Sequence, residues 1–103
     1  MAYQYHRQAA VPRKIADIEP EKDARVRLLV KIINKRPFVF TVDDGSRKEV
    51  HVDEGMMNTF EIGDVVRIFA RVMPTEMGFE LTAELVQNMN GLDMELYKKV
   101  LGK

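Results

Sequence analysis

Alternation of apolar and polar residues over Arg25–Lys35 constrains this chain more than any other feature of its sequence. As far as Ile33, the residues of one parity are all apolar: Val26, Leu28, Val30 and Ile32. Residues of the other parity include three cations: Arg25, Arg27, Leu29, Lys31 and Ile33. A period of two over this length is typical of an extended strand with one buried side. The segment therefore predicts a long strand whose opposite side is basic.

Three further regions show the same strand pattern. Val65–Met73 alternates, with Val66, Ile68, Ala70 and Val72 predicted inward and Val65, Arg67, Phe69 and Arg71 outward. Phe79–Val86 alternates too, with Phe79, Leu81, Ala83 and Leu85 opposed to Glu80, Thr82 and Glu84. Phe38–Val42 and Arg47–Val52 flank Asp43-Asp44-Gly45-Ser46, and an Asp-Gly pair between such runs indicates a hairpin. The chain thus predicts five strands.

The connections and the ends of the chain have different patterns. Asn34–Pro37 and Pro74–Gly78 carry turn residues, and Asp53–Phe60 predicts a loop or a short helical connection. From residue 92 the apolar residues follow helical spacing: Leu92, Leu96, Tyr97, Val100 and Leu101. We expect a flexible basic and aromatic arm over residues 1–13, a barrel over 14–88, and a C-terminal helix over 89–103 that serves assembly or packs on the barrel.

This order of elements predicts the fold class. A long first strand, a hairpin, an irregular connection, a second hairpin and a terminal helix match a five-stranded OB-fold, which is a Greek-key barrel. The predicted fold is therefore all-β with a C-terminal α-helix. With 103 residues, one domain is expected.

The net charge of zero conceals an uneven distribution. Residues 1–36 hold nine basic and four acidic side chains, a net of +5, and residues 37–103 hold seven and twelve, a net of −5. Such asymmetry indicates a polyanion or an opposed partner surface. The sequence has no cysteine, which excludes disulfides and thiolate metal sites and fits a reducing intracellular environment. No apolar run approaches the length of a membrane span, and Met1–Ala10 does not resemble a secretory signal.

Four segments, taken in order, resemble the archaeal replication protein A small-subunit family. They are Arg13-Lys14-Ile15-Ala16-Asp17-Ile18, Arg25-Val26-Arg27-Leu28-Leu29-Val30, Val42-Asp43-Asp44-Gly45-Ser46 and Ile62-Gly63-Asp64-Val65-Val66-Arg67. The resemblance covers roughly residues 11–101. It implies single-stranded DNA binding in DNA replication and repair, within a hetero-oligomer of OB-fold subunits joined through C-terminal helices. It also implies an intracellular, cytoplasmic location in association with the nucleoid.

Binding of single-stranded DNA requires cations along the phosphates and flat rings under the bases. The candidate nucleic-acid-binding residues are Arg25, Arg27, Lys31, Lys35, Arg36, Arg47, Lys48, Arg67, Phe69 and Arg71. In an OB-fold the ligand lies across the second and third strands and between the loops that here are Asn34–Pro37 and Pro74–Gly78. The candidate partner-binding residues are those of the helical stripe, Leu92, Leu96, Tyr97, Val100 and Leu101.

Less specific interpretations compete with several of these assignments. The row of Arg67 and Arg71 equally fits a solvated face or pairing with cross-strand glutamates. Phe38 and Phe40 share a predicted strand face and are expected in the core, whereas Phe69 lies opposite the core. Tyr3 and Tyr5 fit base stacking or a disordered arm equally well. The abundant methionines are expected to fill the core, with the pair Met56–Met57 as an alternative partner surface.

Catalysis has little support in this sequence. His6 and His51 are the two histidines, without the spacing of a hydrolytic metal site, and no phosphate-binding or nucleophile-elbow motif occurs. Asp43-Asp44 is better explained by turn chemistry than by metal binding because Gly45 follows. We predict a protein that is not an enzyme and uses no cofactor, metal, membrane or small-molecule substrate. Two alternatives to DNA binding stay open: a structural scaffold for OB-fold partners, and an RNA-binding OB-fold protein.

Overall fold

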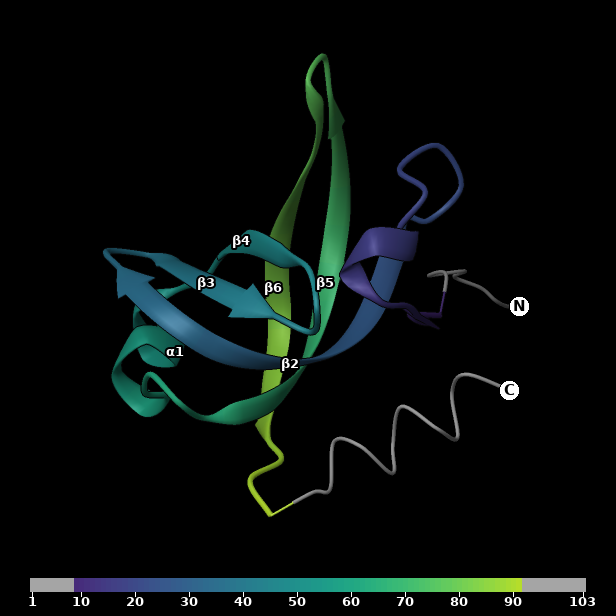
Figure 1. Ribbon diagram of the computed structural model, residues 1–103. Helices are drawn as coiled ribbons and strands as arrows, with labels where there is room; N and C mark the ends of the chain where they lie inside the picture. The colour runs from purple at the N-terminus through teal and green to yellow at the C-terminus, as the bar shows by residue number, and fades with distance from the viewer. Residues whose placement is uncertain (1–8, 92–103) are drawn as a thin grey trace, which may run out of the picture.

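The computed structural model describes residues 9–91 and arranges them around a closed β-barrel (Figure 1). The elements in chain order are β1 (Val11–Pro12), the 3₁₀ turn η2 (Ile15–Asp17), β2 (Arg25–Arg36), β3 (Val39–Asp43), β4 (Arg47–His51), α1 (Glu54–Thr59), β5 (Val65–Thr75) and β6 (Gly78–Asn88). The five predicted strands are confirmed as β2 to β6. The expected short connection over residues 53–60 contains the helix α1.

The long strand β2 closes the barrel because it pairs on both of its edges. The sheet order is β1-β2-β3-β4-β6-β5, and β2 also pairs antiparallel with β5. The residues of β2 that precede Lys31 pair with β5, and those that follow it pair with β3. A strand that belongs to both halves must coil, and a register shift between Ile32 and Asn34 allows this. This arrangement is the OB-fold barrel.

The core of the barrel is filled by the apolar side chains that the alternation in the sequence predicts to point inward. Val26, Leu28, Val30 and Ile32 of β2 are fully buried, as are Val66, Ile68 and Ala70 of β5. Phe40 and Leu28 are the bulkiest fully buried side chains. Met56 and Met57 of α1 are half-buried and pack against this core. Met73 is 45% and Met77 is 96% exposed, so the expectation that the methionines fill the core is wrong for these two residues.

The turn between β2 and β3 differs from the prediction. The strand continues through Asn34, Lys35 and Arg36, so only Pro37 and Phe38 form the turn. Phe38 has a φ of 62° and is 56% exposed. The expectation that Phe38 lies in the core beside Phe40 is therefore wrong. The reason is that a left-handed residue in the turn breaks the alternation that would place the two rings on one face.

A β-bulge changes the face of the last strand. Phe69 pairs with Leu85 but Ala70 pairs with Ala83, so Glu84 is an extra residue in β6. Because two residues of β6 oppose one residue of β5 here, the alternation of inward and outward side chains in β6 is reversed after the bulge. Leu85 is consequently 48% exposed and Val86 is buried, so the prediction that Leu85 faces the core is wrong. The β5–β6 turn is also shorter than predicted, since the strands extend to Thr75 and restart at Gly78.

α1 is capped at its start and attached to the barrel strand β2 at its end. Asp53 caps its start, where the carboxylate accepts a hydrogen bond of 2.8 Å from Met56 N. Lys35 Nζ donates to the carbonyls of Met57 and Phe60 at 2.8 and 2.7 Å. A cation on the last carbonyls of a helix is favoured by the helix dipole. Lys35 therefore stabilises this connection.

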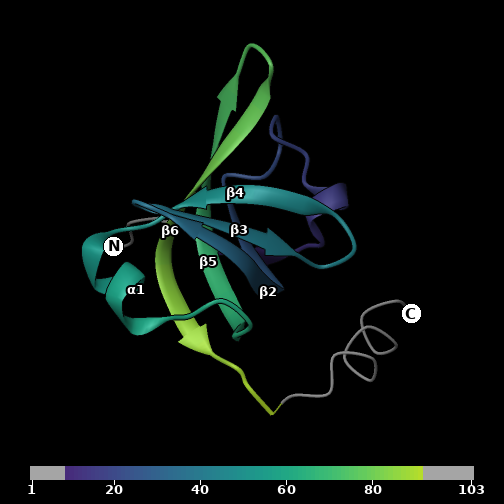
Figure 2. The same cartoon turned by 60° about the vertical axis from the view of Figure 1, so that its left-hand side comes forward.

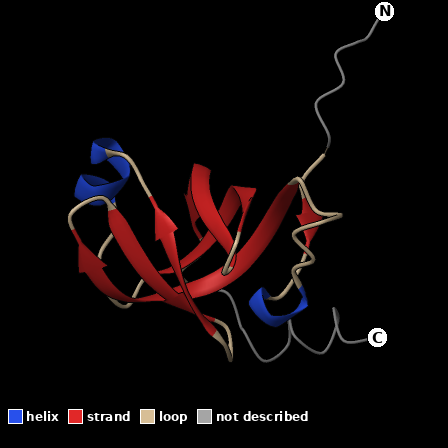
Figure 3. Ribbon diagram, turned by 90° about the horizontal axis from the view of Figure 1, so that it is seen from above, coloured by secondary structure: helices blue, strands red, loops and turns tan. Residues whose placement is uncertain are grey.

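The segment before β2 is held by two buried carboxylates. Asp44 Oδ2, from the hairpin turn, accepts a hydrogen bond of 2.9 Å from Ile15 N. Asp23 accepts two hydrogen bonds from Arg13, at 3.0 and 3.1 Å, and one of 2.9 Å from Glu19 N. These contacts place η2 on the side of the barrel away from α1 (Figure 3). The Arg13 guanidinium, followed by the Glu19 N–H, lowers the pKa of Asp23.

This arrangement predicts an acid sensitivity that depends on Asp23. An unfolded aspartate titrates near pH ~3.9, so the contribution of Asp23 is complete above that value and is lost as the pH falls through its lower folded pKa. We expect Asp23→Asn to reduce the free energy of unfolding at neutral pH by about 1 kcal/mol and to flatten its decline below pH ~4. Urea denaturation over a pH series measures this effect. Asp17→Asn, at an exposed carboxylate of η2, is the control, and equal pH slopes in the two variants would contradict the assignment.

Some predictions concern residues outside the described part of the chain. The C-terminal helix, with Leu92, Leu96, Tyr97, Val100 and Leu101, and the arm as far as residue 8 stay predictions. The proposed barrel boundary at residue 14 also stays one, although Val11 and Pro12 already pair with β2. Within residues 9–91 there is no helix of the length and apolarity that crossing a membrane requires.

Candidate nucleic-acid interface

A hollow of about 570 Å³ lies where the hairpin of β3 and β4 meets the beginning of β6. Figure 2 shows the β5–β6 hairpin rising above β4 at this place. We call this hollow the groove, and its lining residues are Thr41, Arg47, Lys48, Glu49, His51, Phe79 and Glu80. It lies over the second and third strands of the barrel, where OB-folds hold oligonucleotides and oligosaccharides.

The ring of Phe79 is held in the groove by Lys48. Lys48 Nζ lies 4.1 Å from the centre of the ring and donates a hydrogen bond of 2.7 Å to the carbonyl oxygen of Phe79. The cation–π contact orients the ring, and the carbonyl fixes the ammonium beside it. Phe79 is partly buried and packs against the core, as its inward position predicts. The groove therefore holds the accessible part of a positioned aromatic ring together with a cation that has no carboxylate partner among residues 9–91.

Phe38 extends this surface at the tip of the β2–β3 turn. The adjoining pair of the ladder joins Val39 to His51, so the turn lies beside the groove. Its carbonyl accepts a hydrogen bond of 3.0 Å from Val52 N, which anchors the left-handed residue to the end of β4. An exposed ring in a backbone conformation that disfavours it makes Phe38 a candidate for a functional role. The sequence analysis missed Phe38, and the Pro37 that precedes it is the signal for a turn at this point.

The other cations near the groove are matched by acids. Arg36 pairs with Glu49, and Arg47 Nε lies 3.2 Å from Asp43. His51 Nε2 lies 3.9 Å from Glu80, which forms an ion pair when the histidine is protonated. Of the predicted binding residues, the structure brings together Arg36, Arg47 and Lys48 on this side. Their net charge is small because carboxylates accompany two of them.

Five of the predicted residues lie on the opposite side of the barrel, over β2 and β5. Arg25 Nε lies 2.9 Å and Arg71 lies 3.2 Å from the carboxylate of Glu84, so both cations share the bulge residue. The Arg25 hydrogen bond, and then that of Arg71, lowers the pKa of Glu84. The rest of the set, Arg27, Arg67 and Phe69, occupies neighbouring positions: Arg27 pairs with Phe69, and Leu29 pairs with Arg67.

The two remaining predicted residues have different surroundings. Lys31 is exposed and pairs in the sheet with both Asp43 and Val65, at the boundary between the two sides. Lys35 is largely buried against α1, and its ammonium is engaged by two carbonyls. The structure therefore separates the predicted cations into a groove group, an opposite group and one structural lysine, and their contact with nucleic acid stays a prediction.

The carboxylates of Asp43 and Asp44 serve structural purposes. Asp43 Oδ1 accepts from Gly45 N at 2.7 Å and Asp44 Oδ1 from Ser46 N at 3.3 Å, so this pair is engaged in turn hydrogen bonds. Between residues 9 and 91 no group of three or more histidine and carboxylate side chains is placed to hold a metal ion.

Comparisons with known proteins identify the fold. No protein-family model and no curated protein sequence matches the chain. Among solved structures, the telomere capping protein Ten1 of S. pombe matches with a TM-score of 0.72 at 16% identity, over 91% of this chain and 95% of Ten1. A chain of the S. pombe Stn1–Ten1 complex matches with a TM-score of 0.70 at 18% identity, over 92% of this chain and 90% of that chain.

A third match is the second OB-fold domain of replication protein A from Methanococcus maripaludis. Its TM-score is 0.63 at 13% identity, over 81% of this chain and 99% of that domain. The predicted OB-fold is confirmed. The resemblance to archaeal replication protein A is confirmed at the level of the fold.

Proposed function

We propose that the chain is a non-catalytic OB-fold subunit of a single-stranded DNA-binding complex of the replication protein A type, and that the groove contacts the DNA. The observation that carries the proposal is the Lys48-held ring of Phe79 in the groove, together with the exposed ring of Phe38 at the turn that adjoins the His51 end of the groove, on the ligand side of an OB-fold. Bases stack on such rings without strict sequence preference, and the nearby cations contact the phosphates.

The structural neighbours support this proposal. One similar structure, with a TM-score of 0.57 at 13% identity over 82% of this chain and 70% of that one, is a replication protein A heterotrimer bound to single-stranded DNA. Others come from the Stn1–Ten1 complex. We infer that this chain likewise works beside other OB-fold subunits, and we propose residues 92–101 as the segment through which they assemble.

A titration of the full chain with a labelled oligonucleotide of about 10 nucleotides tests the groove, since one OB-fold covers roughly 4–16 nucleotides. We expect Lys48→Met to weaken binding about fivefold, because it removes the groove's unmatched cation and releases the ring of Phe79. Lys22→Met is the control: it also removes one exposed charge, but from a loop that does not line the groove. Equal affinities of the two variants would contradict a role for the groove.

The pairing of Arg36 with Glu49 and of Arg47 with Asp43 favours a second candidate, a scaffold subunit that does not touch DNA. A scaffold needs no net charge in its groove. Two outcomes together would select it: no binding of DNA or RNA by the wild-type chain at low salt, and association that depends on protein concentration. If RNA binds more tightly than DNA of the same length and sequence, the chain is instead an RNA-binding OB-fold protein.

A further inference from the structure

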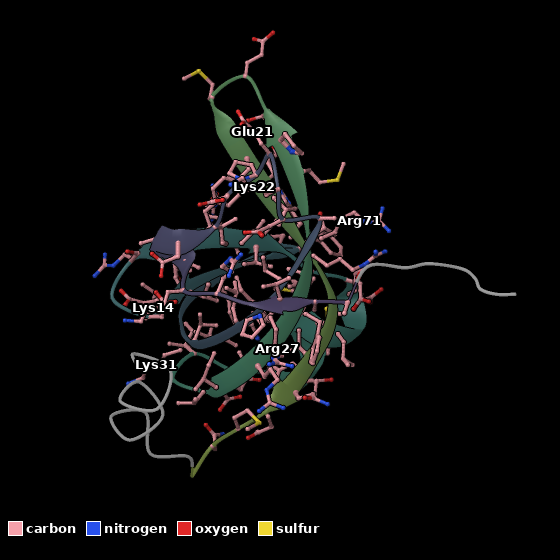
Figure 4. The ribbon with its side chains drawn as sticks, turned by 90° about the vertical axis from the view of Figure 1, so that its right-hand side faces the viewer. Lys14, Glu21, Lys22, Arg27, Lys31 and Arg71 are labelled. Carbon is pink, nitrogen blue, oxygen red and sulfur yellow. The ribbon has the colours of Figure 1, made fainter. Side chains whose placement is uncertain are left out.

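The cations on the outward side of β2 follow the strand around the barrel. Arg36 lies beside the groove, Lys31 lies where β2 changes its partner from β3 to β5, and Arg27 lies opposite Phe69. Arg27 and Lys31 are four residues apart on one strand, which spans about 13 Å. Figure 4 shows Arg27 and Lys31 on the side of the barrel that also carries Arg71.

Arg27 and Lys31 differ from Arg36 and Arg47, because no carboxylate of residues 9–91 forms an ion pair with them. Arg27, Lys31 and Arg67 form no ion pair within residues 9–91, whereas Arg25 and Arg71 share Glu84. The Nε atom of Arg67 is buried and has no hydrogen-bond acceptor in that part of the chain. A buried donor without an acceptor is unfavourable, so Arg67 is an incompletely satisfied cation of this face.

An aromatic ring lies among these cations. Phe69 is half-buried, pairs with Arg27 on one side and with Leu85 on the other, and lines a second hollow of about 470 Å³. Cations beside a ring that is partly accessible are a combination that single-stranded nucleic acid can use. We call Arg27, Lys31, Arg67 and Phe69 the outer tract.

We propose that single-stranded DNA leaving the groove continues along β2 and binds the outer tract. This inference rests on the proposed function, since it extends the DNA beyond the groove that the proposed function assigns. The groove holds a short segment with little net charge, and the outer tract adds phosphate contacts and one stacking position. Binding therefore depends on the length of the strand.

The experiment compares oligothymidylates of about 8 and about 20 nucleotides, one within and one beyond the span of a single groove. For the wild-type chain we expect the longer strand to bind about tenfold more tightly, with a salt dependence steeper by about 1.4, which corresponds to two phosphate contacts on a single strand. Arg27→Gln/Lys31→Gln keeps most of the stems of both side chains. We expect it to abolish this gain while binding the short strand as the wild type does.

Lys48→Met is the matched comparison because it changes the other site. We expect it to weaken the binding of both oligonucleotides and to leave the ratio of their affinities unchanged. Thermal melting of each variant confirms that the barrel is folded. If the double variant does not fold, two other variants replace it. Arg27→Lys/Lys31→Arg preserves the charge, and we expect the longer strand to keep its tighter binding in this variant. Phe69→Ala removes the ring, and we expect the advantage of the longer strand to fall.

The outcomes separate this inference from the proposed function. Failure of the wild-type chain to bind the short strand contradicts the proposed function. Binding of the short strand without a gain from length contradicts the outer tract alone. An equal loss for both strands in Arg27→Gln/Lys31→Gln also overturns it, because that result reports the general charge of the protein. Loss of self-association in this variant would assign the face to protein contact instead.

Discussion

Phe38→Gly is expected to weaken the binding of single-stranded DNA about tenfold and to raise the free energy of unfolding by about 1 kcal/mol. The loss of affinity follows from the removal of an exposed ring, since a base stacked on an aromatic side chain contributes roughly 1–3 kcal/mol. The gain in stability follows from the φ of 62° at this residue. Glycine adopts this conformation without the steric cost that a β-carbon imposes.

Phe38→Ala separates the two effects. Alanine removes the ring but keeps the β-carbon, so we expect the same loss of affinity and no gain in stability. Fluorescence anisotropy with a short oligonucleotide measures the first quantity, and urea denaturation measures the second. An affinity of Phe38→Gly equal to that of the wild type would remove Phe38 from the interface, whatever its stability.

The barrel was predictable because its strands alternate. Val26, Leu28, Val30 and Ile32 are buried as their parity indicates, and the hairpin at Asp43–Ser46 forms where the Asp-Gly pair predicts it. The errors occur where one residue breaks the period. Glu84 is inserted as a bulge, so Leu85 turns outward and Val86 inward. A bulge depends on the register between two strands, and a single strand's sequence does not contain that register.

The sequence identifies the charged and aromatic residues of the candidate site, but it does not show which groups surround each of them in the fold. The sequence shows that Arg25, Lys35 and Arg71 are cations, but their partners are distant in the chain. Glu84 forms ion pairs with both arginines, and the carbonyls of Met57 and Phe60 engage the lysine. The separation of groove cations from those of the outer tract likewise follows from the closure of β2 on β5, which brings together residues about 40 positions apart.

Phe40→Ala is expected to have the largest effect on stability, about 4 kcal/mol, because it leaves a cavity at one of the bulkiest fully buried side chains of the core. A domain of this size is usually stable by about 5–15 kcal/mol, so the variant approaches unfolding. Its melting temperature is expected to fall by about 20 °C.

Phe40→Leu, which retains most of the buried volume, should lose only about 1 kcal/mol. Phe38→Ala should melt as the wild type does, although the two phenylalanines are two residues apart and a regular strand would place them together. Thermal unfolding followed by circular dichroism compares the three variants. If Phe38→Ala and Phe40→Ala lost equal stability, both rings would lie in the core, and the turn at Pro37 and Phe38 could not supply a stacking surface to the groove.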